Sequence, residues 1–160
     1  MPTLVLVRHA QAAYSHPDHS RPLTDAGLDQ AARLGGAVAR DVGGFDVAVC
    51  SDATRARETF GQISQRVRVR DGWFDRSVYN ADEEDILTLA RTFEGERALI
   101  VGHEPTMSGV GYVLAREDSR GEVARGIPTA TALILSFDGA WEDLSPGSAA
   151  LCLILTPPTR

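Results

Sequence analysis

Arginine and histidine side chains recur in this sequence at points where apolar runs end. Arg8 and His9 follow the apolar residues 4–7, and His103 comes shortly after a similar run at 98–101. A guanidinium can hold an oxyanion through two parallel hydrogen bonds, and an imidazole can attack or deprotonate a bound group. Either histidine alone would more often be structural. Two histidines at matching positions predict a shared anion-binding site that contains a nucleophile or a base.

A third apolar run ends in a similar way. Residues 45–50 lead into Ser51, and Arg55 follows at the start of a predicted helix. We expect Arg55 to belong to the anion site and Ser51 to turn the chain in a structural role. Arg57, two residues further along the helix, is expected to point away from the site.

The elements that must position these side chains are strands buried on both faces. The three apolar runs lack polar alternation, as central strands of parallel sheets do. Helical patterns lie near 25–42, 52–65, 82–93 and 106–114, with a short strand at 67–69, an irregular stretch at 71–82 and closing strands at 130–137 and 150–155. This order predicts an α/β fold of one domain over residues 1–160, with a mostly parallel sheet between helices. The carboxyl ends of its strands would bring the polar side chains together.

Composition limits the classes of partner. The 160-residue chain has a net charge of −6 and no block of basic residues, which argues against a nucleic-acid partner. No apolar run approaches the ~18 residues that span a bilayer, and the N-terminus lacks the pattern of a signal peptide. We therefore expect a cytoplasmic protein without a membrane partner. Cys50 and Cys152 lie in apolar runs and are expected to be buried, reduced thiols.

Four motifs resemble the histidine phosphatase superfamily, and most closely its SixA-type phosphohistidine phosphatase branch. They occur in the family's order: Val7-Arg8-His9-Ala10, Arg21-Pro22-Leu23-Thr24 with Gly27, Ser51-Asp52-Ala53-Thr54-Arg55-Ala56 with Thr59, and Gly102-His103-Glu104-Pro105. The resemblance implies a phosphoglycerate mutase-like, three-layer α/β/α fold. It also implies a phosphatase that works through a phosphohistidine intermediate, without a metal or a cofactor.

The resemblance assigns a role to each matched residue. His9 would be the nucleophile, Arg8 and Arg55 would clamp the phosphoryl oxygens, and His103 would donate a hydrogen bond to them. The attacking nitrogen of His9 must be unprotonated, and a hydrogen bond from the other ring nitrogen to a backbone carbonyl would fix that tautomer. Three further residues are expected to contact the substrate: Arg21, Ala10 and Glu104.

One feature of the larger family is missing from the sequence. Many members carry an acid after the third strand that protonates an alcohol leaving group. The corresponding stretch holds five acids, none in a context that resembles this donor: Asp75, Asp82, Glu83, Glu84 and Asp85. An alkoxide needs such a donor, whereas an imidazole whose ring is protonated leaves as a neutral group. The missing acid favours a phosphohistidine substrate, and Glu104 is the other candidate for the acid.

The short connections between the strands leave no room for a capping subdomain, so we expect an open, shallow site. Such a site suits a phosphorylated protein, for example a histidine-containing phosphotransfer domain. Two alternatives remain. The first is a broad small-molecule or sugar phosphomonoesterase of the same superfamily, and the second is a catalytically idle module that binds phosphoproteins. Trp73, Phe74 and Tyr79 would either pack in the interior or line the mouth of the site.

Overall fold

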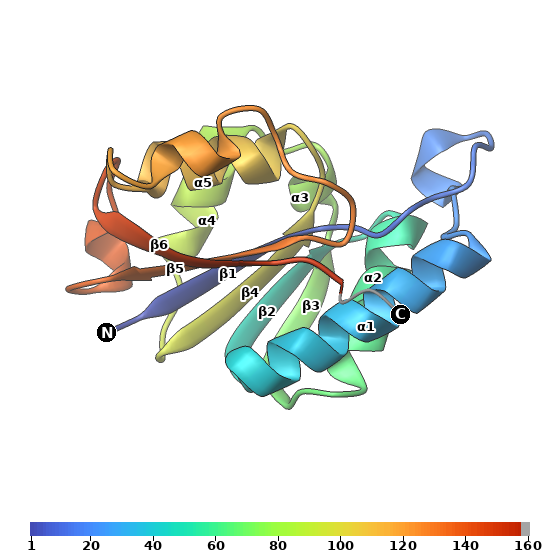
Figure 1. The fold of residues 1–160 in the computed structure, drawn as a ribbon, viewed down its shortest axis with the longest axis horizontal. Helices are drawn as coiled ribbons and strands as arrows, with labels where there is room; N and C mark the ends of the chain where they lie inside the picture. The colour runs from blue at the N-terminus through green and yellow to red at the C-terminus, as the bar shows by residue number, and fades with distance from the viewer. Residues whose placement is uncertain (158–160) are drawn as a thin grey trace.

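The computed structural model describes residues 1–157 and places a six-stranded sheet between two layers of helices (Figure 1). The strands are β1 (Thr3–Arg8), β2 (Phe45–Ser51), β3 (Val69–Asp75), β4 (Arg97–Gly102), β5 (Ala132–Phe137) and β6 (Ala149–Leu155). The helices are α1 (Asp25–Asp41), α2 (Thr54–Ser64), α3 (Arg76–Tyr79), α4 (Glu83–Ala90) and α5 (Thr106–Leu114), with short 3-10 turns η1 (Asp18–Ser20), η2 (Arg120–Val123) and η3 (Trp141–Asp143). The strand order is β3-β2-β4-β1-β5-β6, and β5 runs antiparallel to both of its neighbours. The predicted α/β/α fold is confirmed, and its two closing strands, β5 and β6, pair antiparallel.

Strand β1 is buried on both faces, as its apolar run predicts. Leu4 and Leu6 pack on one face with residues of α4 and α5, and Val5 and Val7 pack on the other face with residues of α1 and α2. All four side chains are fully buried. The sheet therefore has an apolar core on each side, and polar side chains of the central strands are confined to the strand ends.

The central parallel strands end level with one another. Arg8 of β1 pairs with Gly102 of β4, and Cys50 of β2 pairs with Val101 of β4. The next residues of these strands and turns meet at one edge of the sheet: His9, Ser51 and His103. Carboxyl ends of parallel strands are the usual position of a ligand site in such sheets.

The loop between β1 and α1 is tied together at its two ends. Thr24 caps α1 by accepting a hydrogen bond from the Gly27 N–H at 3.0 Å, and the Thr24 N–H donates to the Gln11 carbonyl at 3.1 Å. Gly27 lies so close to the Gln11 carbonyl oxygen that a Cβ at this position would overlap it. This close approach requires glycine, and it holds the loop that carries η1 beside the end of β1.

The structure corrects the sequence analysis in two places. Residues 71–82 are not irregular, because β3 continues to Asp75 and α3 follows it. β3 is an edge strand whose side chains are mostly exposed, so its pairing with β2 leaves no apolar pattern to detect. Cys152 is exposed because β6 is the other edge strand, whereas Cys50 is buried as expected.

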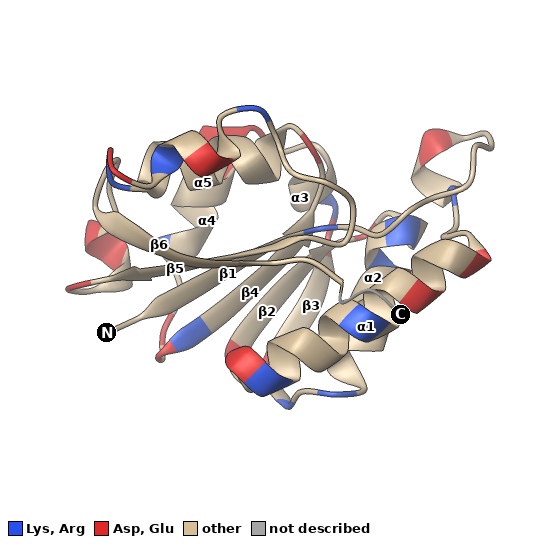
Figure 2. Ribbon diagram, viewed as in Figure 1, with Lys and Arg blue, Asp and Glu red and all other residues tan. Residues whose placement is uncertain are grey.

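Within residues 1–157 no helix has the length and apolar character needed to cross a membrane. Figure 2 shows acidic and basic side chains interspersed along the helices and loops, without a continuous basic stripe across this view.

Candidate active site

The two candidate histidines lie side by side at the edge of the sheet. Their ring centroids are 5.3 Å apart. Burial lowers the pKa of His9 to about 4 and that of His103 to about 3, and the positive charge of Arg55 adds to both shifts. Both rings are therefore neutral near pH 7, and the arrangement can present an unprotonated imidazole to an anion.

The partners of His9 define where its ring proton lies. Nδ1 is 2.7 Å from the carbonyl oxygen of Ala10, which can only accept a hydrogen bond, so Nδ1 carries the hydrogen. Nε2 then bears the lone pair, and Arg55 Nε donates to it at 3.3 Å. The hydrogen bond to a backbone carbonyl that the sequence analysis expected is present. It leaves the lone pair of His9 on the nitrogen that faces a guanidinium.

Arg55 is buried and is held by the first turns of α2 and by the loop above it. Nη1 donates to the Asp18 carbonyl oxygen at 2.8 Å, and Nη2 donates to Asp18 Oδ2 at 3.1 Å. One turn along α2, the Thr59 hydroxyl donates to the Arg55 carbonyl at 2.8 Å and accepts from the Ala10 N–H at 3.0 Å. Helix α2 therefore fixes the guanidinium and the chain after His9 together.

Asp18 is a member of the site that the sequence analysis did not identify. Its Oδ2 accepts from the Tyr79 hydroxyl at 2.6 Å as well as from Arg55, and its Oδ1 accepts from Arg21 Nη1 at 3.2 Å. These hydrogen bonds hold the pKa of Asp18 far below its usual range, and the hydrogen bond from Tyr79 has the largest effect. The carboxylate is therefore ionised and bound to two of the arginines that the sequence assigns to a phosphoryl group.

Arg8 and Arg21 border an open hollow beside His9. Arg8 Nη1 donates to the Ile127 carbonyl and Arg21 Nε donates to the Ala13 carbonyl, both at 2.8 Å. The hollow has a volume of about 450 Å³, and its remaining lining comes from residues 11–14, Thr24 and Thr129. An anion in this hollow would lie between the two guanidinium groups and the His9 ring.

Two buried nitrogens at the site have no hydrogen-bond partner within residues 1–157, namely Arg8 Nε and His103 Nδ1. The other nitrogen of His103, Nε2, lies 2.7 Å from Ser51 Oγ. Buried polar atoms are nearly always satisfied in folded proteins. Within the described residues, these two nitrogens therefore lack the partner that a buried polar atom usually has.

Glu104 holds a loop of the site through its carboxylate. It accepts hydrogen bonds from the Ser108 N–H and hydroxyl, both at 2.7 Å, and from the Ile127 N–H at 3.1 Å. The carbonyl of Ile127 is the group that accepts from Arg8. These contacts connect Glu104 to Arg8 through the backbone of a single residue, Ile127.

The acids between residues 72 and 85 occupy helix starts. Asp75 caps α3, and Asp82 forms a capping box with Asp85 at the start of α4, whose first turn also holds Glu83 and Glu84. Acids in these positions satisfy free N–H groups and favour the helix dipole. No group of three or more His, Cys, Asp or Glu side chains in the described part of the chain could hold a metal ion.

Of the three aromatic residues singled out from the sequence, Tyr79 lies at the site. Its ring is 5.4 Å from that of His103, edge to face. Trp73 and Phe74 lie on β3 and are partly exposed, and Arg57 stacks over the Phe74 ring at 4.2 Å. Arg57 is therefore engaged away from His9, as expected.

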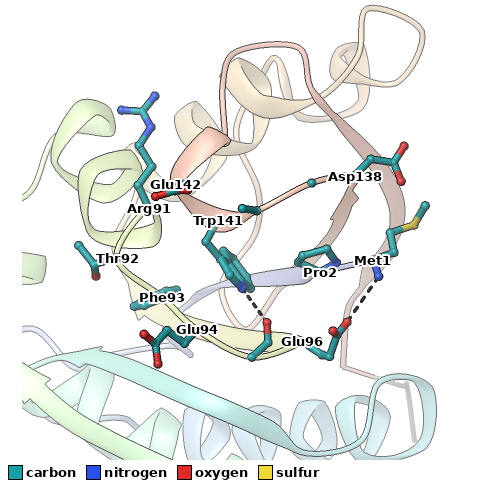
Figure 3. Close-up of a pocket in the computed structure, with 13 residues that line it drawn as sticks. Met1, Pro2, Arg91, Thr92, Phe93, Glu94, Glu96, Asp138, Trp141 and Glu142 are labelled. Carbon is teal, nitrogen blue, oxygen red and sulfur yellow. Dashed lines mark hydrogen bonds and ion pairs between the residues drawn. The ribbon is translucent and has the colours of Figure 1, made fainter.

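A hollow of about 540 Å³ opens at the opposite end of the sheet (Figure 3). Its lining includes Met1, Pro2 and Trp141. Trp141 Nε1 donates to the Gly95 carbonyl at 2.8 Å, and the N-terminal amine pairs with Glu96. This lining includes no histidine or cysteine. The chemistry-bearing side chains therefore lie at the carboxyl edge of the sheet and not in this hollow.

The match to a family model and the similarity to solved structures agree on the family. Residues 4–82 match the histidine phosphatase superfamily (branch 1). An uncharacterized protein of Mycobacterium tuberculosis is 32% identical over 154 residues, which cover 91% of this chain and 96% of that protein. Among solved structures, a candidate phosphohistidine phosphatase SixA from Nakamurella multipartitia has a TM-score of 0.87 and 32% identity, over 99% of this chain and 97% of its own. Its counterpart from Agrobacterium tumefaciens has a TM-score of 0.84 and 27% identity, over 98% and 99% of the two chains.

Proposed function

Because this chain belongs to the histidine phosphatase superfamily and to its SixA-type branch, we propose that it removes the phosphoryl group from phosphohistidine in another protein, with His9 as the nucleophile. The observation that carries the proposal is the state of His9. Its ring is neutral and held by the Ala10 carbonyl through Nδ1, and the lone pair of Nε2 lies beside the Arg55 guanidinium.

Two displacements complete the proposed reaction. In the first, His9 Nε2 forms a bond to phosphorus while the P–N bond of the substrate breaks, and its electron pair returns to the leaving nitrogen. The substrate ring leaves neutral if its second nitrogen already carries a proton. In the second, water attacks phosphorus and the bond to His9 breaks. The products are inorganic phosphate, a proton and the neutral His9 ring.

The arginines and His103 supply the electrostatic part of the reaction. A phosphoryl group in transfer carries negative charge on its non-bridging oxygens, and preorganised donors stabilise that charge. Arg8 Nε is a buried donor with no partner among the described residues, and His103 Nδ1 is a buried ring nitrogen that also has none there. Arg55 and Arg21 already contact one carboxylate, that of Asp18, and this contact supports a role for the two arginines in binding negatively charged oxygens.

The surroundings of the acids favour a P–N substrate over a phosphate ester. Asp18 is close to the arginines, but its lowered pKa keeps it ionised and unable to donate a proton near pH 7. Glu104 and Asp75 accept hydrogen bonds from backbone N–H groups. An alkoxide leaving group would depend on a proton donor, and a protonated imidazole would not.

The test compares turnover of a phosphohistidine peptide with that of p-nitrophenyl phosphate, using wild type, His9→Ala and His16→Ala. His16 is an exposed histidine in the loop after β1 and provides the matched control. We expect a strong preference for phosphohistidine that is lost in His9→Ala and kept in His16→Ala. Trapping of phosphate on wild type as an acid-labile, base-stable adduct would support the covalent step.

Three results would contradict the proposal. Equal or faster turnover of phosphate esters would favour a small-molecule phosphomonoesterase. Retained turnover in His9→Ala would exclude His9 as the nucleophile. Binding of the phosphopeptide by wild type without any turnover would favour a phosphoprotein-binding module.

A further inference from the structure

Ser51 contacts His103 in a way that determines the tautomer of that ring. Ser51 is fully buried at the end of β2, and its hydroxyl oxygen has two neighbours within hydrogen-bond distance in the described part of the chain. One is the Ala53 N–H, which donates to it at 3.2 Å. The other is His103 Nε2 at 2.7 Å. The direction of the second hydrogen bond follows from the first.

A serine hydroxyl has one hydrogen to donate and two lone pairs. The Ala53 N–H is a donor and takes one lone pair, so it cannot receive the serine hydrogen. His103 Nε2 is then the acceptor available to that hydrogen. If Nε2 were instead protonated, the buried serine hydrogen would be left without an acceptor, which is unfavourable for a buried polar group.

We infer that Ser51 is a positioning residue: its hydroxyl donates to His103 Nε2 and thereby fixes His103 as the Nδ1–H tautomer, with that N–H directed to the phosphoryl group. The catalytic part of this inference rests on the proposed function, whereas the tautomer does not. Nδ1 of His103 is buried and has no partner within residues 1–157, so it is the ring nitrogen with a hydrogen bond left to form.

The two neighbouring histidines have different hydrogen-bond partners and therefore different roles. In His9, the Ala10 carbonyl takes the Nδ1 hydrogen, and the ring presents a lone pair at Nε2. In His103, the Ser51 hydroxyl occupies the lone pair of Nε2, and the ring presents a hydrogen at Nδ1. Two neutral imidazoles 5.3 Å apart thus offer opposite chemistry, a nucleophile and a hydrogen-bond donor. An uncharged donor also avoids placing a second positive charge beside Arg55.

The tautomer is measured by nitrogen-15 NMR of histidine-labelled protein, with the His103 signals identified by their loss in His103→Gln. We expect wild type to show a protonated Nδ1 and an unprotonated Nε2. In Ser51→Ala the signals should shift toward the Nε2–H form, and Ser51→Thr, which keeps the hydroxyl, should restore them. An Nε2–H signal in wild type, or an unchanged tautomer in Ser51→Ala, would overturn the inference. The wild-type spectrum decides it even if Ser51→Ala fails to fold.

Turnover measurements give the second readout. We expect Ser51→Ala to lower kcat on the phosphohistidine peptide by about 10- to 100-fold, the range for loss of a group that orients a functional histidine. KM should change little, and Ser51→Thr should recover activity. Ser136→Ala removes a hydroxyl that contacts Thr3 on β1, away from the site, and should leave kcat unchanged. Unaltered kcat in a folded Ser51→Ala would overturn the positioning role. Absence of turnover in wild type with the expected tautomer would instead count against the proposed function.

Discussion

His9, which is buried, and His103, which is partly buried, should make the protein sensitive to mild acid. In the folded chain burial lowers the pKa of His9 to about 4 and that of His103 to about 3, while the unfolded chain has the ordinary value of 6.5. At pH 4.5 the unfolded state therefore binds protons that the folded state does not. The contribution of these two rings to the free energy of unfolding is present above about pH 6.5 and is lost as the pH falls from there toward the folded pKa values.

The size of the loss follows from the pH interval. Between pH 7.5 and pH 4.5, each histidine with a folded pKa at or below 4 should lower the free energy of unfolding by about 2.5 kcal/mol. The interval below the unfolded pKa of 6.5 spans 2 pH units, and each unit contributes about 1.36 kcal/mol. A small amount is subtracted because the folded state is itself partly protonated at pH 4.5. The pair together should lower the free energy of unfolding by roughly 5 kcal/mol, a large part of the stability of a typical domain.

Urea unfolding at pH 7.5, 6.5, 5.5 and 4.5 measures this loss in wild type, His9→Gln and His103→Gln. Each variant should lose about 2.5 kcal/mol less than wild type over the interval, because one titrating ring is gone. His16→Gln, at an exposed position, is the control and should follow wild type. Equal losses in wild type and both site variants would refute the reasoning, because the rings would then titrate alike in the folded and unfolded states.

Three further predictions concern activity. Arg55→Lys should lower kcat on phosphohistidine at least 100-fold, since an ammonium cannot reproduce the forked guanidinium that contacts His9 and Asp18. Arg57→Lys is the control, and similar losses of kcat in both variants would contradict a specific role of Arg55. Asp18→Asn should strengthen inhibition by inorganic phosphate several-fold, because it removes a carboxylate from Arg55 and Arg21; an unchanged inhibition constant would show that the carboxylate does not compete with anions. The rate of phosphorylation of His9 in single-turnover experiments should not decrease as the pH is lowered from 8 to 6, because the His9 pKa of about 4 keeps Nε2 unprotonated there. A decrease on acidification, centred near pH 6.5, would mean that the ring titrates as a solvent-exposed histidine does.

Much of the fold and the position of the site follow from simple features of the sequence. The apolar runs before Arg8, Ser51 and His103 predict central strands because burial on both faces leaves no polar positions. The strand ends then bring together residues that are about 50 positions apart in the chain. His9, Arg55 and His103 could be placed in one cluster on that basis.

The contribution of Asp18 could not be predicted in the same way. It reaches Arg55 because the loop after β1 folds back over α2, and its partner Tyr79 comes from a short helix after β3. Neither contact leaves a periodic pattern, since each depends on the path of an irregular segment. The full length of β3 could not be predicted, because an exposed edge strand is held by backbone pairing and has no pattern of apolar side chains.

The side chains of the site are oriented largely by backbone oxygens. The carbonyls of Ala10, Asp18 and Ile127 accept from His9, Arg55 and Arg8, respectively. A main-chain oxygen is supplied by every amino acid, so substitutions at positions 10 and 127 leave these acceptors in place as long as the path of the chain is kept, whereas Asp18 also binds Arg55 through its side chain. Residues around the reacting groups can therefore be substituted during evolution while the backbone keeps the reacting side chains in the same orientation.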